Sequence, residues 1–235
     1  MKKLSIIIPV YNEESTIKEI LKRVKKVKLN GGLVKEIIVV DDKSKDGSLK
    51  ILKGIRGIKL FCHKVNQGKG AAVRTGMSHA IGDIFLIQDA DLEYNPEDYN
   101  RLLCPMLDGK TKVVYGTRLK NYPLKLFGTR KTPLFTHYFG NKFLTLVTNM
   151  LYGEELTDME TCYKVFTKEV IDGMRINSNR FEFEPEFTAK IMKKGHKIHE
   201  VPIKVKPRGY DEGKKITWKD GFIAIWTLVK YRFVD

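Results

Sequence analysis

Short apolar runs alternate with amphipathic segments through the first half of the chain, and this alternation constrains the possible folds more than any other feature. The runs predict strands that are buried on both faces, at residues 4–10, 36–42, 58–62, 83–88 and 113–115. The intervening segments have the apolar spacing of helices, at residues 13–28, from about 46, at 70–81 and from Pro96. Because strands joined by helices form parallel sheets with right-handed crossovers, the sequence predicts an α/β fold with a Rossmann-like, mostly parallel sheet flanked by helices.

The second half of the chain is less regular. It predicts helices at residues 132–151, 185–194 and 217–233, and strands at 162–166 and 199–205. No repeat, low-complexity stretch or Pro/Ser-rich linker divides the 235 residues. We therefore expect one domain over residues 1–235, in which the elements that set specificity follow the fifth strand.

Composition excludes several classes of protein. Hydrophobic residues make up 42% of the chain, which is enough for a core and excludes a disordered tail. No apolar run approaches the ~20 residues of a membrane span, and Pro9 interrupts the first run too early for a secretory signal. The cysteines Cys62, Cys104 and Cys162 are odd in number and widely spaced, which indicates a reducing, cytoplasmic setting.

Polar residues follow each predicted strand of the first half. Ligands of open parallel sheets bind beyond the carboxyl ends of the strands, so these residues mark the candidate site. They are Tyr11–Glu13, Asp41 and Asp42, His63 and Asn66, Asp89–Glu93 and Gly116–Arg118. Capping of the following helix is the simpler explanation for Asp46. It is weaker for Asp41 and Asp42, because adjacent carboxylates repel unless a cation or a donor lies between them.

Asp89 and Asp91 predict a metal site. Side chains alternate along an extended segment, so the two carboxylates lie on one side of it, and Glu93 follows them. Such carboxylates hold a hard divalent ion and leave the rest of its coordination shell to a substrate diphosphate. The alternative is a solvated turn, since short motifs of this kind also occur by chance.

The glycine-rich stretch at residues 66–70 does not complete a dinucleotide-binding fingerprint, because Val73 stands where the third glycine would fall. The stretch either lets the backbone approach a sugar or phosphate closely or forms a simple turn before a helix. The histidines are scattered and no Ser or Cys has a supporting base, so we exclude a covalent hydrolase.

The ordered motifs of the chain resemble those of family 2 glycosyltransferases with the glycosyltransferase type A fold, and in particular the dolichol-phosphate mannosyltransferase branch with its bacterial and archaeal polyprenyl-phosphate relatives. The motifs are SIIIPVYNE at 5–13, DDKSKDGS at 41–48, NQGKG at 66–70, DAD at 89–91, GTR at 116–118, TDMETCYK at 157–164, FEFEPE at 181–186, EVP at 200–202, and Arg208 with Gly213 and Lys214. The likeness covers essentially the whole chain. It implies inverting transfer of a hexose from a nucleotide-sugar, a GDP- or UDP-hexose, to a polyprenyl phosphate. The donor half would be about residues 1–118 and the acceptor half about 119–235.

The resemblance also implies roles for individual residues. Those expected at the donor nucleotide are Pro9, Tyr11, Glu13, Val40, Asp42, Lys69, Asp89, Ala90 and Asp91. Those expected to hold Mg²⁺ or Mn²⁺ are Asp89, Asp91 and Glu93, where dolichol-type members often carry Gln at the last position. Those expected to bind phosphate on the acceptor side are Arg118, Arg130, Arg208 and Lys214, and the expected catalytic residues are Asp91, Arg118 and Asp158.

The acceptor decides which catalyst the reaction needs. A phosphate monoester is already anionic at neutral pH and attacks without a base, so catalysis rests on positioning and on stabilising the leaving diphosphate. A sugar hydroxyl would need a carboxylate base, for which Asp158 is the best candidate unless it orients a loop. Glu182, Glu184 and Glu186 have the spacing of one face of an extended segment, and we expect at least two of them to bind backbone groups or Arg180.

The net charge of +15 is concentrated after the predicted metal site. Between Gly109 and Gly153 there are eight Lys or Arg and no Asp or Glu, interleaved with large apolar side chains. This composition suits a surface that rests on an anionic leaflet, where each cation is worth ~1 kcal/mol. The C-terminal helix has a similar apolar stripe, which either faces the membrane or packs against the sheet. We expect an enzyme at the inner face of the membrane, resting on it or held by an anchoring membrane protein.

Other functions fit the sequence less well. A basic chain invites a nucleic-acid partner, but no recognition motif is present and the strand-end acids would repel phosphates, so we expect none. A sugar-1-phosphate nucleotidyltransferase would have a Gly-rich, Arg-containing loop after the first strand, where this chain has Tyr11, Asn12 and Glu13. A module that only binds would keep its function in the D91N variant.

Overall fold

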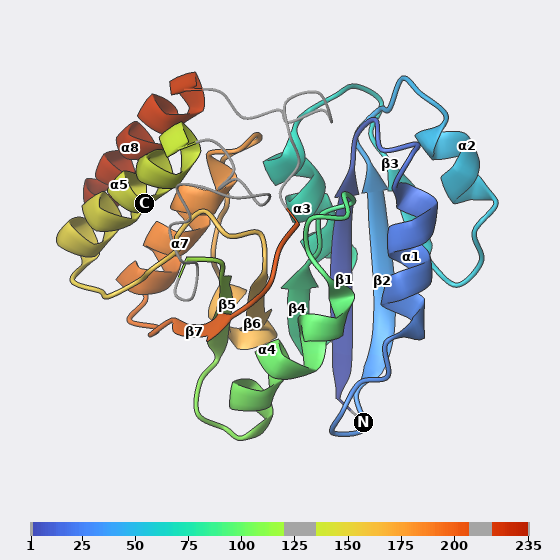
Figure 1. Cartoon of the computed structure of the whole chain (residues 1–235), viewed down its shortest axis with the longest axis horizontal. Coiled ribbons are helices and arrows are strands. Elements are labelled where there is room, and N and C mark those ends of the chain that lie inside the picture. The colour runs from blue at the N-terminus through green and yellow to red at the C-terminus, as the bar shows by residue number, and fades with distance from the viewer. Residues whose placement is uncertain (1, 120–134, 207–217, 235) are drawn as a thin grey trace.

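The computed structural model describes residues 2–119, 135–206 and 218–234. Within them, seven strands form one sheet in the order β3-β2-β1-β4-β6-β5-β7 (Figure 1). The strands are β1 (Lys3–Val10), β2 (Val34–Asp41), β3 (Lys59–Cys62), β4 (Ile84–Ile87), β5 (Val113–Thr117), β6 (Lys164–Thr167) and β7 (His199–Pro202). Neighbouring strands are parallel except at β6, which is antiparallel to both β4 and β5. The predicted α/β fold with a mostly parallel sheet is confirmed.

Helices connect the strands, as the alternation predicted. They are α1 (Ile17–Lys26), α2 (Ser48–Lys53), α3 (Lys69–His79), the 3₁₀ turn η1 (Pro96–Asp98), α4 (Tyr99–Leu107), α5 (Phe135–Tyr152), α6 (Lys168–Ile171), α7 (Phe183–Lys193) and α8 (Trp218–Phe233). The first helix is shorter than the predicted range 13–28, because the carbonyl of Glu13 accepts the N–H groups of Thr16 and Ile17 in a turn. The short helix α6 was not predicted.

Burial explains the apolar runs. Leu4 to Val10 of β1 are all buried, since β1 lies between β2 and β4 and helices cover the sheet. On α1 the buried side chains recur at helical spacing, while Lys18 and Lys22 do not belong to this buried face. Each fully buried Leu or Ile contributes roughly 1.5–3 kcal/mol. The buried apolar core therefore reaches up to the polar residues that follow the strands.

The antiparallel strand β6 determines the geometry of the site. Tyr115 pairs with Lys164 and Val113 with Phe166, so β6 starts beside the carboxyl end of β5. The loop that precedes β6, with Asp158, therefore reaches the same edge of the sheet as the carboxyl ends of β4 and β5. No pattern in the sequence predicted this insertion.

The helices α5 and α8 lie side by side at one end of the molecule, next to α7 (Figure 1). A small apolar cluster with Leu144, Met192 and Leu228 joins the three helices. The stripe of α8 was predicted to face either a membrane or the sheet; its buried side instead packs on these helices, and Trp226 is exposed. Among the described residues, no helix has the length and apolar character that a membrane span requires.

Candidate functional site

The loops that follow β1 and β2 hold each other at the carboxyl edge of the sheet. The N–H of Asn12 donates to Oγ of Ser44 at 3.0 Å, and the side-chain oxygen of Asn12 accepts the N–H of Lys45 at 2.8 Å. Glu13 is turned toward its own loop, where it accepts the hydroxyl of Thr16 at 2.9 Å. The N-cap residue of α2 is Gly47, but Asp46 directly before it accepts the N–H of Ser48, the first residue of the helix, at 3.0 Å.

Asp42 organises the loop that leads into α3. It is buried, and its carboxylate accepts the N–H groups of Gln67 at 2.8 Å and Gly68 at 2.7 Å. The same carboxylate lies 2.7 Å from Nδ1 of His63 and accepts the side-chain amide of Asn66 at 2.9 Å. Asp42 was expected at the nucleoside, but in the structure its oxygens are occupied by the protein itself.

Asp41 differs from its neighbour. One carboxylate oxygen accepts the N–H of Ser44 at 3.2 Å, while Oδ1 is buried and has no hydrogen-bond partner. Side chains alternate in an extended chain, so Asp41 and Asp42 point to opposite faces and do not repel each other as a pair. A buried acceptor without a donor is costly, and a ligand N–H would satisfy it. The sequence analysis placed Asp41 at the candidate site but assigned it no role in binding.

The glycines of the 66–70 loop allow the backbone of residues 178–180 to lie against this loop. Gly68 has φ of 100°, and a Cβ there would lie 2.5 Å from the carbonyl oxygen of Asn179. A Cβ on Gly70 would lie 2.6 Å from the carbonyl oxygen of Ser178. The close approach that the glycines allow is therefore to the segment before α7.

Buried charges alternate in sign beneath the end of β4. Nζ of Lys69 lies 2.9 Å from Oδ1 of Asp89 and 3.1 Å from Oε1 of Glu184, and Glu184 also pairs with the buried Lys164. Burial would raise the pKa of Asp89, but the Lys69 ammonium outweighs it and holds that pKa below its usual value. Lys69 and Asp89 were expected at the donor nucleotide; here they neutralise each other.

The segment after Asp89 remains at the edge. Ala90 is buried, whereas Asp91 and Glu93 are partly exposed. Oδ1 of Asp91 accepts the N–H of Glu93 at 3.1 Å, and the carbonyl of Glu93 accepts the N–H of Lys206 at 2.9 Å. Lys206 is the last residue of its described range, and Arg208 and Lys214 lie outside the described residues.

These residues fit a metal only in part. Within residues 2–119, 135–206 and 218–234, no three His, Cys, Asp or Glu side chains form a metal-binding group. The structure therefore does not gather Asp89, Asp91 and Glu93 into the predicted three-carboxylate site. Mg²⁺ and Mn²⁺ are hard ions that also bind through one or two carboxylates and a substrate diphosphate. The partly exposed Asp91 meets that lesser requirement.

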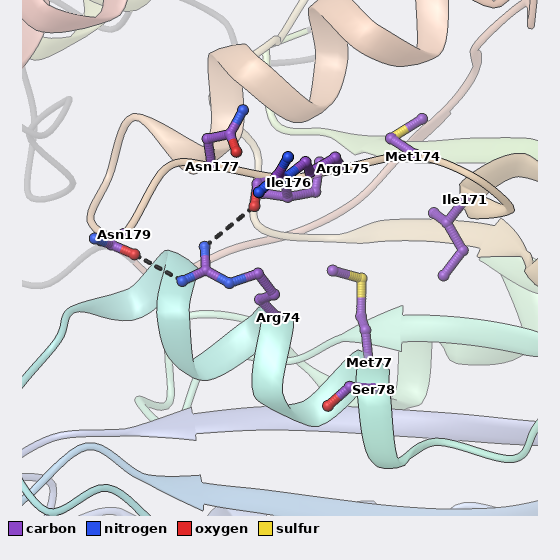
Figure 2. A pocket seen from close by; sticks show the side chains of 9 residues that line it. All are labelled: Arg74, Met77, Ser78, Ile171, Met174, Arg175, Ile176, Asn177 and Asn179. Atoms are coloured by element: carbon purple, nitrogen blue, oxygen red, sulfur yellow. Dashed lines mark hydrogen bonds between the residues drawn. The ribbon is translucent and has the colours of Figure 1, made fainter. Parts of the chain in front are cut away.

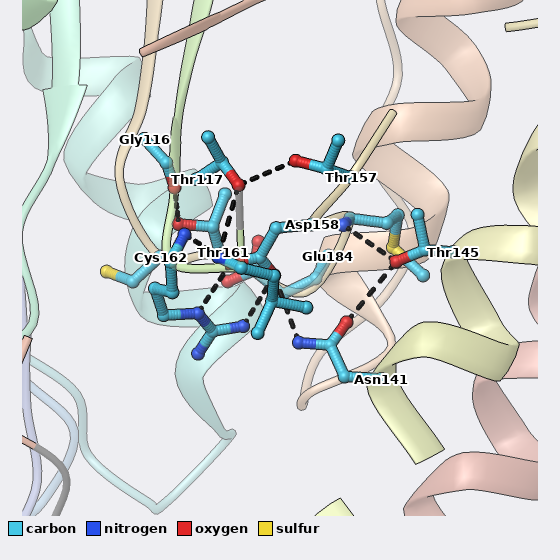
Figure 3. A network of polar contacts seen from close by, with 12 residues as sticks. Gly116, Thr117, Asn141, Thr145, Thr157, Asp158, Thr161, Cys162 and Glu184 are labelled. Carbon is cyan, nitrogen blue, oxygen red and sulfur yellow. Dashed lines mark hydrogen bonds and ion pairs between the residues drawn. The ribbon is translucent and has the colours of Figure 1, made fainter. Parts of the chain in front are cut away.

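Arg118 is held in one orientation by Asp158. Nε and the N–H of Arg118 donate to Oδ2 at 2.7 and 2.9 Å, and Nη2 donates to Oδ1 at 2.7 Å (Figure 3). Asn141 of α5 donates to the same Oδ1 at 3.0 Å. Burial would raise the pKa of Asp158, but these contacts outweigh it and keep that pKa below its usual value. A carboxylate engaged in this way is a weak base and a strong positioning group.

The loop that carries Asp158 is itself anchored. The Glu200 carboxylate on β7 accepts the N–H groups of Thr157 at 2.9 Å and Asp158 at 3.0 Å. The hydroxyl groups of Thr117 and Thr157 lie 2.6 Å apart and tie this loop to β5 (Figure 3). Glu200 thus supports Arg118 through Asp158, a role that the sequence pattern did not reveal.

Glu160 is the second site residue that the sequence analysis missed. Its Oε1 is buried without a hydrogen-bond partner. Burial and the nearby Glu184 raise its pKa to about 7, because Lys164 and Arg118 offset them only in part. It lies on the same loop as Asp158, and its titration range makes it the stronger base of the two.

Glu182, Glu184 and Glu186 were predicted to lie along one face of an extended segment. This prediction was wrong, because Glu182 lies directly before α7 and Glu184 and Glu186 lie in its first turn. Two of them bind backbone groups as predicted: Glu186 accepts the N–H of Asn177 at 2.9 Å, and Glu182 that of Arg180 at 3.1 Å.

The remaining predicted residues differ in location. Pro9 is buried at the end of β1, and Tyr11 follows it at the edge, half-buried. Val40 is fully buried against Ala72 of α3. Arg130, Arg208 and Lys214 lie outside the described residues. Asp41, Asp91 and Arg118 thus lie at the same edge of the sheet, at or after the carboxyl ends of β2, β4 and β5.

A surface pocket of about 670 Å³ lies elsewhere, between α3 and the segment 171–179. Figure 2 shows Arg74 reaching from α3 to this segment, where it donates to the carbonyl of Ile176 at 3.3 Å and to Asn179 at 2.7 Å. Its lining contains none of the predicted site residues, and its arginine is used to hold the segment. The pocket has no evident chemistry.

The chain is similar to known glycosyltransferases in sequence. The model of the family described as Glycosyl transferase family 2 matches residues 5–174. The UDP-N-acetylglucosamine–dolichyl-phosphate N-acetylglucosaminyltransferase of Methanococcus voltae is 28% identical, over 97% of this chain and 95% of that protein. The undecaprenyl-phosphate 4-deoxy-4-formamido-L-arabinose transferase of Klebsiella pneumoniae is 27% identical, over 91% of this chain and 63% of that protein.

Solved structures show the same fold. Glucosyl-3-phosphoglycerate synthase from Mycobacterium tuberculosis, in complex with UDP, superposes with a TM-score of 0.76 at 17% identity, over 100% of this chain and 81% of that chain. Its complex with Mn²⁺, UDP and glucosyl-3-phosphoglycerate gives a TM-score of 0.75 at 19% identity, with the same coverage.

Proposed function

The chain belongs to glycosyl transferase family 2, and from this premise we propose that it transfers a hexose, with inversion, from a nucleoside-diphosphate sugar to a polyprenyl phosphate. One observation carries the proposal: the Asp158 carboxylate fixes the Arg118 guanidinium at the sheet edge that also carries Asp91. A guanidinium in fixed orientation recognises phosphate oxygens. The names of the relatives from M. voltae and K. pneumoniae, which both specify polyprenyl-phosphate acceptors, support this choice.

The donor would lie over the ends of β1, β2 and β4. Oδ1 of Asp41 would accept an N–H of the base, such as N3–H of uracil, which is compatible with the expected UDP- or GDP-sugar. Asp91, with help from Glu93, would hold Mg²⁺ or Mn²⁺. When bound, the ion would neutralise charge on the leaving diphosphate. The Mn²⁺ and UDP in the M. tuberculosis enzyme support these choices of ion and nucleotide.

The acceptor phosphate would bind at Arg118, whose side chain is 22% exposed. Its oxygen attacks the anomeric carbon as the bond to the diphosphate breaks, and no proton has to be removed. Arg118 holds the attacking phosphate in line, and Asp158 with Glu200 hold Arg118. Arg130, Arg208 and Lys214 lie outside the described residues, and we propose that they add positive charge for the acceptor phosphate. Since a polyprenyl phosphate is embedded in a bilayer, the enzyme would act at the membrane surface.

A second candidate function is transfer to a hydroxyl acceptor. Glu160 favours it, because a buried carboxyl with a pKa of about 7 and an oxygen without a partner can accept a proton near neutral pH. Asp158 was the base expected from the sequence for this reaction, but its contacts with Arg118 and Asn141 disfavour it.

One assay separates these functions. The purified full chain is incubated with Mn²⁺, radiolabelled UDP-, GDP- or dTDP-sugars, and polyprenyl phosphate in detergent. We expect label in the organic phase, and none with the D91N variant or after chelation of the metal. Transfer of label only to a soluble hydroxyl acceptor would contradict the lipid acceptor and favour the second candidate. Undiminished transfer by D91N would contradict the role of Asp91.

A further inference from the structure

The helices α5 and α8 each have a second apolar side that faces outward. On α5 this side carries Phe143, Leu146 and Met150, which are 55%, 55% and 78% exposed. On α8 it carries Ile223, Trp226 and Phe233, which are 47%, 67% and 78% exposed. Steps of three, four and seven residues place each set along one side of its helix. We call these six side chains the α5–α8 face.

The α5–α8 face is not explained by the fold. The opposite sides of the two helices already pack into the protein through residues such as Leu144 and Leu228. Apolar side chains scattered singly over a surface are ordinary, but several on two helices that contact each other indicate an interaction site. Figure 1 shows the two helices together at the end of the molecule, with α7 next to them.

Charge indicates the kind of partner. The sequence of α5 contains no acid and includes Lys142, and α8 ends with the exposed Lys230 and Arg232. With a net charge of +15, two copies of the chain repel each other, whereas an anionic surface attracts it. Apolar side chains flanked by cations are the composition of helices that lie in the interface of an anionic bilayer.

The α5–α8 face is also linked to the catalytic edge. Asn141 lies one turn or less from Phe143 on α5, and it donates to the Asp158 carboxylate that holds Arg118. Residues two apart point to nearly opposite sides of a helix, so Asn141 faces the Asp158–Arg118 pair while Phe143 faces outward. Contact of α5 with a bilayer would therefore leave about one helix diameter (~10 Å) between the bilayer and this pair.

We propose that the α5–α8 face inserts into the headgroup region of an anionic lipid bilayer and presents Arg118 to acceptor phosphates there. This inference rests on the proposed lipid acceptor, but it makes its own prediction: the chain binds vesicles that contain neither donor nor acceptor. Trp226 would enter the interface, where indole rings favour the boundary between headgroups and acyl chains.

Vesicle sedimentation tests the proposal. The full chain is mixed with vesicles of phosphatidylcholine alone or of phosphatidylcholine with an equal amount of phosphatidylglycerol. We expect binding to the anionic vesicles and a loss of roughly ten-fold or more in affinity for F143E/W226E. The matched control V34E/I81E changes two exposed apolar residues outside this face, 43% and 61% exposed, and adds the same charge. Unchanged melting temperatures would show that both variants fold.

Several outcomes would overturn the proposal. The first is that the wild type does not bind anionic vesicles. The second is that V34E/I81E loses as much affinity as F143E/W226E, because charge alone would then explain binding. The third is that the wild type is a dimer that F143E/W226E dissociates, because a second copy would then cover the face. In a W218F background, a blue shift of Trp226 emission on anionic vesicles would support insertion, and an unchanged spectrum would contradict it. Because vesicle binding needs no transfer, its result is independent of the detergent assay of the reaction.

Discussion

Two parts of the carboxyl edge of the sheet are held by different interactions: the loops after β1 and β2, and the region where β5 ends and β6 begins. At the first, Asp42 holds a loop mainly through neutral N–H groups of Gln67, Gly68 and Asn66. At the second, Asp158 holds the charged side chain of Arg118, and Glu160 stands nearby with an unpaired oxygen. The difference teaches that the proposed donor side is shaped by loops that Asp42 holds through hydrogen bonds within the protein, with Oδ1 of Asp41 left over. The proposed acceptor side is instead shaped by an ion pair that fixes a charged side chain.

The largest effect is expected for Arg118→Ala. We expect transfer to fall by about 10²–10³-fold, as for other donors that stabilise charge in the reaction, while nucleotide affinity changes only a few-fold. Initial rates and a titration with the nucleotide would measure the two effects. An equal loss in both would contradict an acceptor role for Arg118.

The control for Arg118→Ala concerns stability, because the variant leaves the buried Asp158 without its counter-ion, which destabilises proteins by about 3–5 kcal/mol. The double variant R118A/D158N removes that charge and should fold while remaining inactive. Lys112→Ala, which removes an exposed ion pair with Glu169, should leave transfer unchanged.

Glu160→Gln tests whether the buried carboxyl group of Glu160 takes up and releases a proton near neutral pH. The raised pKa of about 7 means that the folded protein resists ionisation of Glu160. Its contribution to stability is therefore complete below the ordinary pKa of about 4.5 and is lost as pH rises through about 7. Between about pH 5 and pH 8 the wild type should lose on the order of 2.5 kcal/mol relative to Glu160→Gln.

Urea unfolding of both proteins across this pH range would measure the effect of Glu160. Parallel stability curves would show that Glu160 does not titrate there. Loss of transfer to a hydroxyl acceptor in Glu160→Gln, with transfer to polyprenyl phosphate intact, would assign it as the base of the second candidate reaction.

Asp42→Asn tests whether the donor edge depends on internal hydrogen bonds. An amide offers one acceptor oxygen, so at least one of the partly buried N–H groups in the 66–68 loop would lose its partner, at about 1 kcal/mol. The midpoint of urea unfolding should fall accordingly. Asp108→Asn, at an exposed ion pair with Lys110, should change it little. Unchanged stability together with lost nucleotide binding would show instead that Asp42 contacts the ligand.

The smallest effect is expected for Asp41→Asn. Because Oδ1 has no donor in the protein, the exchange should leave stability nearly unchanged. Affinity for UDP should fall roughly ten-fold, the equivalent of one hydrogen bond to a base. Calorimetric titration with UDP would measure it, and equal affinities for wild type and variant would contradict the proposed base contact.

Much of the architecture follows from local patterns. The apolar runs predicted β1 to β5 because strands buried on both faces need nearly continuous apolar sequence, and this need does not depend on which strands are neighbours. The polar residues after those runs predicted the edge that carries the site, because parallel strands place their carboxyl ends together. Asp91 and Arg118 were found in this way.

Contacts between distant residues could not be predicted. The preference of Asp42 for a loop 25 residues away, the pairing of Lys69 with Glu184, and the anchoring of Asp158 by Glu200 all depend on the folded arrangement. Titration depends on it too, since burial and the neighbouring Glu184 raise the pKa of Glu160. A sequence motif names residue types, but it does not say which partners satisfy them.

The sequence by itself determined the alternation of strands and helices, the edge that holds the polar residues, and the excess of positive charge. The tertiary structure decided that β6 enters the sheet between β4 and β5, so that Asp158 meets Arg118, and that α5 and α8 lie together with apolar sides exposed. The physical reason is range: periodicity and strand ends are set by neighbours in the chain. Charge pairing and burial are set by residues that only folding brings together.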